Sequence, residues 1–301
     1  MSTSTYIIVL NWNGVDDTIE CIQSLKKMTY RDYAILLVDN ASTDGSVAVL
    51  SKKFPEIKII EAHKNLGFAG GANLGMRHAL SAGAQYLILL NNDTVVAPDF
   101  AGELVKAAEN DKKAGILSSK VYFYDRPGVL WYAGASFNRW LGWGRHRGFG
   151  SMDIGQFDRL EPTGRPCGCA LLATREFCEK AGLLEEEYFC YCEDMEWGMR
   201  AGNLGYATLF VPSSKVWHKV SRSTGGPATA KALYYSVRNT LKCLDTDAPL
   251  PFGLRHIRIL LVLVISILSL FTMNIPKVLG LKRIFHGVMD YLEGKFGELV
   301  E

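Results

Sequence analysis

The sequence predicts an α/β fold with a mainly parallel central sheet, followed by C-terminal hydrophobic and amphipathic helices. Through the first 110 residues, short apolar runs alternate with polar loops and helical patterns. This alternation is typical of parallel strands joined by crossover helices. An uncharged apolar stretch, residues 259–275, then stands apart near the C-terminus. We therefore divide the chain into a catalytic domain, 1–245, with halves 1–110 and 111–245, and a C-terminal segment, 246–301.

The expected strands are short runs rich in Val, Ile and Leu, because a strand covered on both faces is apolar throughout. In the first half they are residues 6–10, 33–38, 57–61 and 86–90. The helices expected between and after them are 16–27, 46–54, 75–82 and 98–110. Asp16 or Asp17 would cap the first helix, and Pro98 would open the last.

The second half has weaker periodicity. Residues 115–164 are rich in Gly, Trp, Tyr and Arg, which favours a long substrate-covering loop or a small hairpin insertion. The elements expected after them are a strand at 169–173, helices at 175–181 and 193–201, and a short strand or turn at 211–218.

Composition narrows the class of protein. The 301 residues include 33 Lys and Arg against 31 Asp and Glu, and this balance argues against a nucleic-acid partner. Hydrophobic residues make up 48% of the chain, which excludes disorder as its main state. The seven cysteines, an odd number, favour a reducing compartment and buried thiols rather than disulfides or zinc. With no signal-peptide pattern, we expect the chain to stay inside the cell.

Polar residues follow two of the predicted strands directly. Asp39 and Asp93 are placed to bind a ligand or a hard cation at the carboxyl edge of the sheet, although a lone Asp there more often caps a turn. His218 would complete a divalent metal site with Asp93, or would simply be packed. The Glu193-Asp194 doublet opens a predicted helix, and adjacent carboxylates shift each other's pKa as a general base requires.

The glycine-rich stretch 65–75 is a separate feature. It matches neither the dinucleotide-binding pattern nor the P-loop. Glycine permits a close backbone approach to a ligand, but such a stretch is also common in ordinary turns. We expect a loop here, with the following helix beginning at residue 75.

Five motifs in order carry a resemblance to a known family. They are VLNWN (9–13), LVDNAS (37–42), NLGFAGGAN (65–73), LLNNDT (89–94) and EDME (193–196). Together they resemble the family 2 glycosyltransferases, and most closely the bacterial rhamnosyltransferase-like branch, which has the GT-A fold. The resemblance extends over about residues 5–245 and includes YYSVRN (234–239).

This resemblance implies roles for particular residues. The pocket for the donor nucleotide, a dTDP- or UDP-sugar, would consist of Leu10, Asn11, Asn13, Asp39, Asn65, Gly67, Asn91 and Asn92. Asp93 and His218 would bind Mg²⁺ or Mn²⁺. Asp194 would be the catalytic base, supported by Glu193. One position departs from the family's D-x-D motif: Asn91 replaces its first carboxylate, which removes one charge from the metal site.

The implied activity is metal-dependent, inverting sugar transfer. The sugar, rhamnose or another hexose, would pass from a nucleoside diphosphate to a hydroxyl of a growing, lipid-linked bacterial surface glycan. A sugar nucleotidyltransferase is one alternative, although residues 11–14 lack the Gly-rich, basic loop that such enzymes carry after their first strand. A non-catalytic subunit that binds nucleotide-sugars within a membrane glycan-assembly complex is the other.

The apolar stretch 259–275 is short for a membrane-spanning helix, which needs about 20 apolar residues. Basic residues flank it on both sides. We expect a membrane-embedded or interfacial helix, with a core or homo-oligomer interface as the alternative. Residues 281–296 are amphipathic and would lie along a bilayer. The expected location is the cytoplasmic face of the bacterial inner membrane, peripheral or C-terminally anchored.

Overall fold

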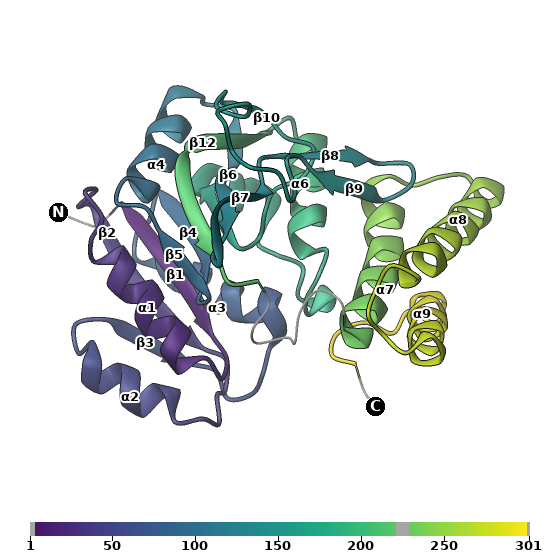
Figure 1. Ribbon diagram of the computed structural model, residues 1–301, viewed down its shortest axis with the longest axis horizontal. Helices are drawn as coiled ribbons and strands as arrows, with labels where there is room; N and C mark the ends of the chain where they lie inside the picture. The colour runs from purple at the N-terminus through teal and green to yellow at the C-terminus, as the bar shows by residue number, and fades with distance from the viewer. Residues whose placement is uncertain (1–3, 221–228, 300–301) are drawn as a thin grey trace.

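The computed structural model describes residues 4–220 and 229–299. A sheet flanked by helices forms one side of the molecule, and helices α7, α8 and α9 form the other (Figure 1). The strand order along the sheet is β10-β12-β6-β11-β4-β1-β2-β3, with β5 also paired to β12 and β7 to β6. The prediction of an α/β fold with a mainly parallel central sheet is confirmed.

Four parallel strands form the first half of the sheet. They are β1 (Thr5–Asn11), β2 (Tyr33–Asp39), β3 (Lys58–Glu61) and β4 (Tyr86–Asn91). β1 lies between β2 and β4 and is parallel to both. Because the chain continues to β3 on one side of β1 and to β4 on the other, β1 and β4 form a topological switch point. Ligands of open α/β sheets bind beyond the carboxyl ends of such strands.

The other half of the sheet is mixed. Its strands are β5 (Thr94–Val96), β6 (Ala114–Phe123), β7 (Arg126–Tyr132), β10 (Glu161–Pro162), β11 (Ala170–Thr174) and β12 (Ala207–His218). β11 runs antiparallel to both β4 and β6, and β12 is parallel to β6. A separate hairpin contains β8 (Ala135–Asn138) and β9 (Trp143–His146).

Alternate side chains of β1 pack into two different apolar cores. Ile7 and Val9 face the core made with α1 (Val15–Leu25), α2 (Ser46–Lys53) and α4 (Phe100–Asn110). Ile8 faces the opposite core, made with α3 (Gly67–Ser81), α5 (Arg175–Ala181) and α6 (Glu193–Asn203). Both faces of the sheet are therefore covered, which explains the continuous apolar runs.

Helix α3 begins at Gly67, so the loop predicted over 65–75 is wrong. Its glycines serve packing rather than a turn. A Cβ on Gly71 would lie 2.6 Å from Leu10 Cδ1, and one on Gly75 would lie 2.5 Å from Ile8 Cγ2. The bare face of the helix therefore rests directly on β1.

The loop or hairpin predicted for 115–164 is wrong in its first part, because β6 is a buried strand within the sheet. The hydrophobic pattern did not indicate this strand because polar residues interrupt its apolar run. Ser118, Ser119 and Lys120 are fully buried. Lys120 Nζ donates to Asp153 Oδ2 at 3.0 Å and to Asp158 Oδ1 at 2.6 Å, so the buried charge is paired. The hairpin alternative holds for β8 and β9.

The predicted cap of the first helix is also wrong. Gly14 is the N-cap of α1, and as a glycine it has no side chain to cap the helix. The helix begins earlier than expected because the chain turns at Asn13, which has φ 51°. Asp16 and Asp17 lie in the first turn instead, where carboxylates favour the positive end of the helix dipole.

The C-terminal helices form an apolar cluster of their own. They are α7 (Ala230–Asp247), α8 (Phe252–Leu270) and α9 (Lys277–Leu292). Leu233 and Val237 of α7 pack with Val262 of α8 and Ile284 of α9. Within the described ranges, α8 is the one helix that is long and apolar enough to cross a membrane. Its mean hydropathy is 1.9, and 22% of its most apolar 18-residue stretch is buried. The boundary at 245/246 stays a prediction.

Candidate active site

The carboxyl ends of β1 and β2 bring Asn11 and Asp39 side by side, in register. Asn11 Nδ2 donates to Asp39 Oδ1 at 2.8 Å. Asn92, which follows β4, donates to Asn11 Oδ1 at 3.2 Å and to Thr18 Oγ1 at 2.9 Å. All four residues are buried. Three of the predicted donor-pocket residues thus belong to one polar network, which fixes the shape of the strand ends at the switch point.

Asn65 and Gly67 reach the same edge through a residue that sequence reasoning missed. Asn40 Nδ2 donates to Asn65 Oδ1 at 2.9 Å and to the Gly67 carbonyl oxygen at 3.0 Å. Gly67 has φ +71°, and a Cβ there would lie 2.3 Å from the Phe189 carbonyl oxygen, so the position requires glycine. The structure therefore brings the loops after β2 and β3 together, as the donor-pocket prediction needs.

Asn13, the remaining loop residue of that prediction, joins the first loop to the second. The backbone N of Asn13 donates to Ser42 Oγ at 3.0 Å, and its side-chain Oδ1 accepts from the backbone N of Thr43 at 2.7 Å. Leu10 and Asn91 are register partners at the ends of β1 and β4. The predicted pocket residues consequently border one edge of the sheet, although most of their polar atoms bond to one another.

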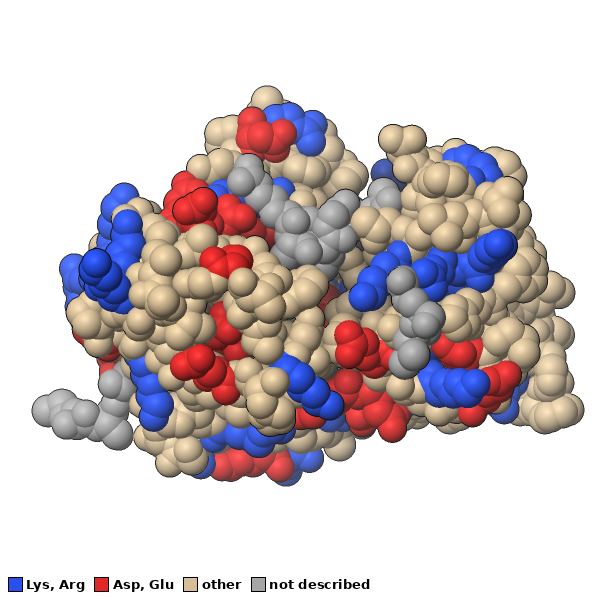
Figure 2. Space-filling view, turned by 90° about the horizontal axis from the view of Figure 1, so that it is seen from below, with Lys and Arg blue, Asp and Glu red and all other residues tan. Residues whose placement is uncertain are grey.

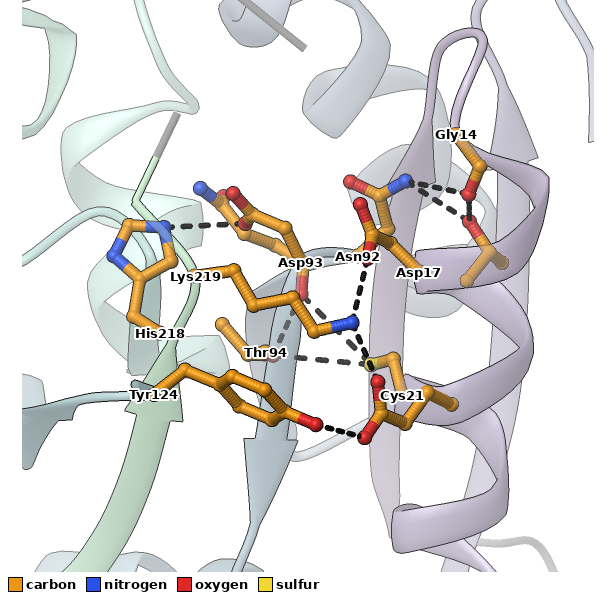
Figure 3. A network of polar contacts seen from close by, with 12 residues as sticks. Gly14, Asp17, Cys21, Asn92, Asp93, Thr94, Tyr124, His218 and Lys219 are labelled. Atoms are coloured by element: carbon orange, nitrogen blue, oxygen red, sulfur yellow. Dashed lines mark hydrogen bonds and ion pairs between the residues drawn. The ribbon is translucent and has the colours of Figure 1, made fainter. Parts of the chain in front are cut away.

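Asp93 and His218 meet where the short strand β5 pairs with the end of β12 (Figure 3). His218 Nε2 lies 3.1 Å from Asp93 Oδ1, and both side chains are almost wholly buried. Trp131 packs its ring edge-on against the His218 imidazole, with the ring centroids 5.2 Å apart. The fold thus brings these two residues, which are distant in sequence, into contact; their role as metal ligands stays a prediction.

The Asp93–His218 pair fits a divalent cation. Neighbouring ligands of one octahedral Mg²⁺ are about 3 Å apart, since each lies about 2.1 Å from the ion. Both nitrogens of His218 are buried without a hydrogen bond of normal geometry. No third His, Cys, Asp or Glu completes a cluster anywhere in residues 4–220 and 229–299. Further ligands would therefore come from the donor's diphosphate and water.

Lys219 links the Asp93–His218 pair to helix α1. Its amide nitrogen donates to the Asp93 carbonyl oxygen at 2.9 Å, and its Nζ contacts Asp17 and Glu20 of α1 at 2.5 Å (Figure 3). Tyr124 donates to the same Glu20 at 2.6 Å. The end of β12 is thus held to α1, which keeps His218 facing Asp93.

Asp194 is held at the beginning of α6 by three donors. Gly168 N donates to its Oδ2 at 3.0 Å, Arg165 Nη2 to its Oδ1 at 3.0 Å, and Met195 N to its Oδ1 at 2.7 Å. Arg165 was not predicted, and no motif marked it. These three donors fix the orientation of the carboxylate.

Glu193 differs from its neighbour. Its Oε2 is buried with no hydrogen-bond partner among the described residues. Burial, and then the charge of Asp194, raise the pKa of Glu193 to about 8. Glu193 is therefore protonated at neutral pH. Its carboxyl group therefore adds no second negative charge beside Asp194.

The β4–β11 ladder places the Glu193-Asp194 doublet near the Asp93–His218 pair. Asn91 N donates to the Cys169 carbonyl oxygen at 2.9 Å, and the neighbouring Gly168 contacts Asp194. Trp131 also contacts the β8–β9 hairpin, because its ring packs against the His146 ring with the centroids 4.7 Å apart. Burial, followed by the charge of Arg165, lowers the pKa of His146 to about 4, so it is neutral.

Glu193→Gln is expected to flatten the pH dependence of stability. Because the pKa of Glu193 is raised in the folded state, stability from its protonated form is complete below about pH 4 and declines towards pH 8. The slope for one such group is at most about 1.4 kcal/mol per pH unit. Urea unfolding at several pH values between these limits measures it. Parallel profiles for wild type and Glu193→Gln would contradict the assignment, and the exposed Glu109→Gln serves as control.

The fold and the site define a nucleotide-sugar-transferase architecture of the GT-A type. The structure aligns with GalNAc-T7 solved with UDP, GalNAc and Mn²⁺, at TM-score 0.63 and 17% identity, over 80% of this chain and 47% of that one. It also aligns with the mannosyltransferase PcManGT from Pyrobaculum calidifontis in complex with GDP-Man and Mn²⁺, at TM-score 0.61 and 15% identity, over 97% and 88%.

The sequence comparisons give the family. The model of glycosyl transferase family 2 matches residues 6–181, and the chain belongs to this family. N-acetylglucosaminyl-diphospho-decaprenol L-rhamnosyltransferase of Mycobacterium tuberculosis is 29% identical over 71% of this chain and 76% of that protein. The dTDP-rhamnosyl transferase RfbF of Shigella flexneri is 21% identical over 85% and 86%. The predicted resemblance to bacterial rhamnosyltransferases is confirmed.

Proposed function

We propose that the protein transfers a deoxyhexose such as rhamnose, with inversion, from a nucleoside diphosphate to a hydroxyl of a lipid-linked glycan. One observation carries this proposal. The strand ends at a single edge of the sheet bring together the Asn11–Asp39 network, the Asp93–His218 pair and the carboxylate of Asp194. A donor pocket, a diphosphate site and a base are the three parts that such a transfer requires.

Asp194 is the proposed base. An acceptor hydroxyl is a weak nucleophile until its proton is removed, and a positioned carboxylate contributes about 10²–10⁴-fold to such a step. Arg165 and Gly168 fix the carboxylate, and protonated Glu193 keeps a second charge away from it. Single displacement needs a base on the acceptor side and no enzyme nucleophile. This arrangement supports inversion at the anomeric carbon.

Asp93 and His218 are the proposed ligands of Mg²⁺ or Mn²⁺. A divalent cation at this position stabilises the negative charge that develops on the leaving diphosphate. Asn91 contributes no charge, so the protein supplies a single formal charge, that of Asp93, to this site. The buried position of the pair excludes water from the side facing Trp131.

The names of the relatives guide the choice of substrates for a test. Purified protein would be incubated with dTDP-rhamnose, UDP-sugars and GDP-sugars, with a polyprenyl-diphosphate-linked N-acetylglucosamine as acceptor. We expect transfer from dTDP-rhamnose and release of dTDP. Formation of nucleotide-sugar from sugar phosphate would instead identify a nucleotidyltransferase. Binding without turnover for every donor would identify a non-catalytic subunit.

Helices α8 and α9 are the proposed membrane-associating part. Leu260, Val264 and Leu268, spaced at i and i+4, are 59%, 43% and 62% exposed along α8. Uncharged surface lies along the outer edge of this end of the molecule, with Lys and Arg beside it (Figure 2). An apolar helix face next to basic side chains suits an anionic bilayer surface. The location proposed is the cytoplasmic face of the inner membrane.

The triple variant Leu260→Gln, Val264→Gln and Leu268→Gln is expected to lose membrane binding. Burial of each such apolar side chain contributes up to about 2 kcal/mol, so the partition coefficient should fall about 100-fold or more. Co-sedimentation with phosphatidylglycerol-containing vesicles measures it. Ile154→Gln, at a position 83% exposed and outside these helices, is the matched control. Equal sedimentation of the triple variant and the control would contradict the proposal.

A further inference from the structure

The segment that leads into the Glu193-Asp194 doublet has a strained backbone. Phe189, Tyr191 and Cys192 have φ values of 62°, 65° and 72°. Side chains other than glycine rarely adopt this left-handed region, because their Cβ atoms crowd the backbone. Three such residues in one short segment need support from the surrounding structure.

That support comes from Asn239 on α7. Its side chain is fully buried. Nδ2 contacts three carbonyl oxygens of the segment, those of Tyr188 at 2.9 Å, Cys190 at 2.9 Å and Tyr191 at 2.7 Å. A single amide group therefore contacts three carbonyl oxygens within four residues of the chain.

Arg238 sets the orientation of this amide. Its Nε donates to Asn239 Oδ1 at 2.9 Å, which leaves Nδ2 facing the carbonyl oxygens. Its Nη2 also lies 3.3 Å from the Tyr188 carbonyl oxygen. Adjacent side chains on α7 thus act on the same segment, and the buried guanidinium makes the direction of the Asn239 amide unambiguous.

The segment held by Asn239 contacts both functional parts of the site. Cys192 is the N-cap of α6, so its backbone angle sets the direction of the first turn of α6, which contains Glu193 and Asp194. On the other side, the Phe189 carbonyl oxygen accepts from Ala69 N at 3.2 Å and lies against Gly67 of the donor pocket. A change in this segment would therefore move the base relative to the donor.

We infer that Asn239 is a positioning residue that fixes residues 188–192 and thereby holds Asp194 in place for transfer, with Arg238 orienting its amide. The inference rests on the proposed transferase function. Asn239 contacts neither the donor-pocket residues nor the Asp93–His218 pair. Its loss should therefore affect turnover rather than donor binding.

The test compares kcat and KM for the donor in Asn239→Ala and wild type. Misplacement of a reacting group by about 1 Å costs about 100-fold in rate, so we expect a loss of that order in kcat with KM for the donor unchanged. Asn239→Ser, which keeps one donor, should lie between the two and covers the case in which the alanine variant fails to fold.

A compensating change separates positioning from general packing. Cys192→Gly removes the Cβ that disfavours the left-handed angle, so it should restore part of the lost kcat in the Asn239→Ala background. Asn203→Ala is the matched control, because it removes a hydrogen bond between α6 and α7, to the Asp247 carbonyl oxygen at 3.2 Å, that does not involve residues 188–192. We expect Asn203→Ala to keep wild-type kcat. Equal losses in Asn203→Ala and Asn239→Ala, with no rescue by Cys192→Gly, would overturn the inference.

Hydrogen exchange supplies a readout that needs no substrate. Amides of residues 187–196 should exchange faster in Asn239→Ala than in wild type, while the strands of the sheet keep their protection. Unchanged exchange in this segment would overturn the inference by itself. An inactive wild type would instead refute the proposed function, and the exchange result would still decide the structural part.

Discussion

Asp194→Asn should lower kcat about 10²–10⁴-fold, the usual contribution of a general base. The amide has nearly the same size as the carboxylate but cannot take a proton at neutral pH. Gly168 and Arg165 bind the two oxygens of Asp194 separately, so the variant loses one of these contacts while the rest of the strand edge stays intact. Rates of transfer from dTDP-rhamnose, measured at saturating donor and acceptor, check this result.

Two controls define the meaning of that loss. Nucleotide binding, followed by titration calorimetry, should be preserved in Asp194→Asn, because the donor pocket is formed by other strands. Glu196→Gln removes a second buried carboxylate from the same helix, one that pairs with Arg200 at 2.5 Å. It should lower the unfolding temperature and leave kcat near wild type. Wild-type turnover in Asp194→Asn would show that another group is the base.

Asp93→Asn should reduce turnover about 100-fold or more, since a divalent cation contributes several kcal/mol of charge stabilisation in such sites. The substitution removes the single formal charge that the pair offers to the cation. His218→Ala should have a smaller effect, because the imidazole is a neutral ligand. Addition of EDTA to the wild type should abolish transfer, and Mn²⁺ or Mg²⁺ should restore it.

The dependence on metal concentration distinguishes ligand loss from misfolding. Asp93→Asn should need more Mn²⁺ than wild type for half-maximal activity, because its affinity for the ion is lower. Asp99→Asn makes the same chemical change at an exposed position before α4 and should match wild type. Full activity of the wild type in EDTA would refute the metal role of both Asp93 and His218.

The parallel half of the sheet could be predicted from sequence because its strands are apolar on both faces. Residues such as Ile7 and Ile8 face opposite cores, so hydrophobicity alone marked the strand. β6 could not be found in this way. Its buried Lys120 pairs with Asp153 and Asp158, which lie more than 30 residues along the chain. A polar residue satisfied by such distant partners looks like a loop residue in sequence.

The site was predictable where residues stand at strand ends. Asp39 and Asp93 follow apolar runs, and their positions required no knowledge of the tertiary fold. Arg165 and Asn239 had no such signal, because each acts on a segment that only folding brings near. Asn239 lies in the YYSVRN motif, but its hydrogen bonds go to backbone carbonyl oxygens, so the motif did not show which segment it contacts.

The reversed direction of β11 has a consequence for how this chain tolerates change. β11 is paired with β4 in a fixed register, Ala170 opposite Leu90, and the residues just before it hold Asp194. The ladder sets the distance between Asp194, the proposed base, and the strand end that precedes the Asp93–His218 pair. A slip of one residue would shift Gly168 by about 3.3 Å. Insertions in the β8–β9 hairpin should therefore be tolerated. A single deletion within β11 should leave the sheet folded but move Asp194, the proposed base, away from the Asp93–His218 pair.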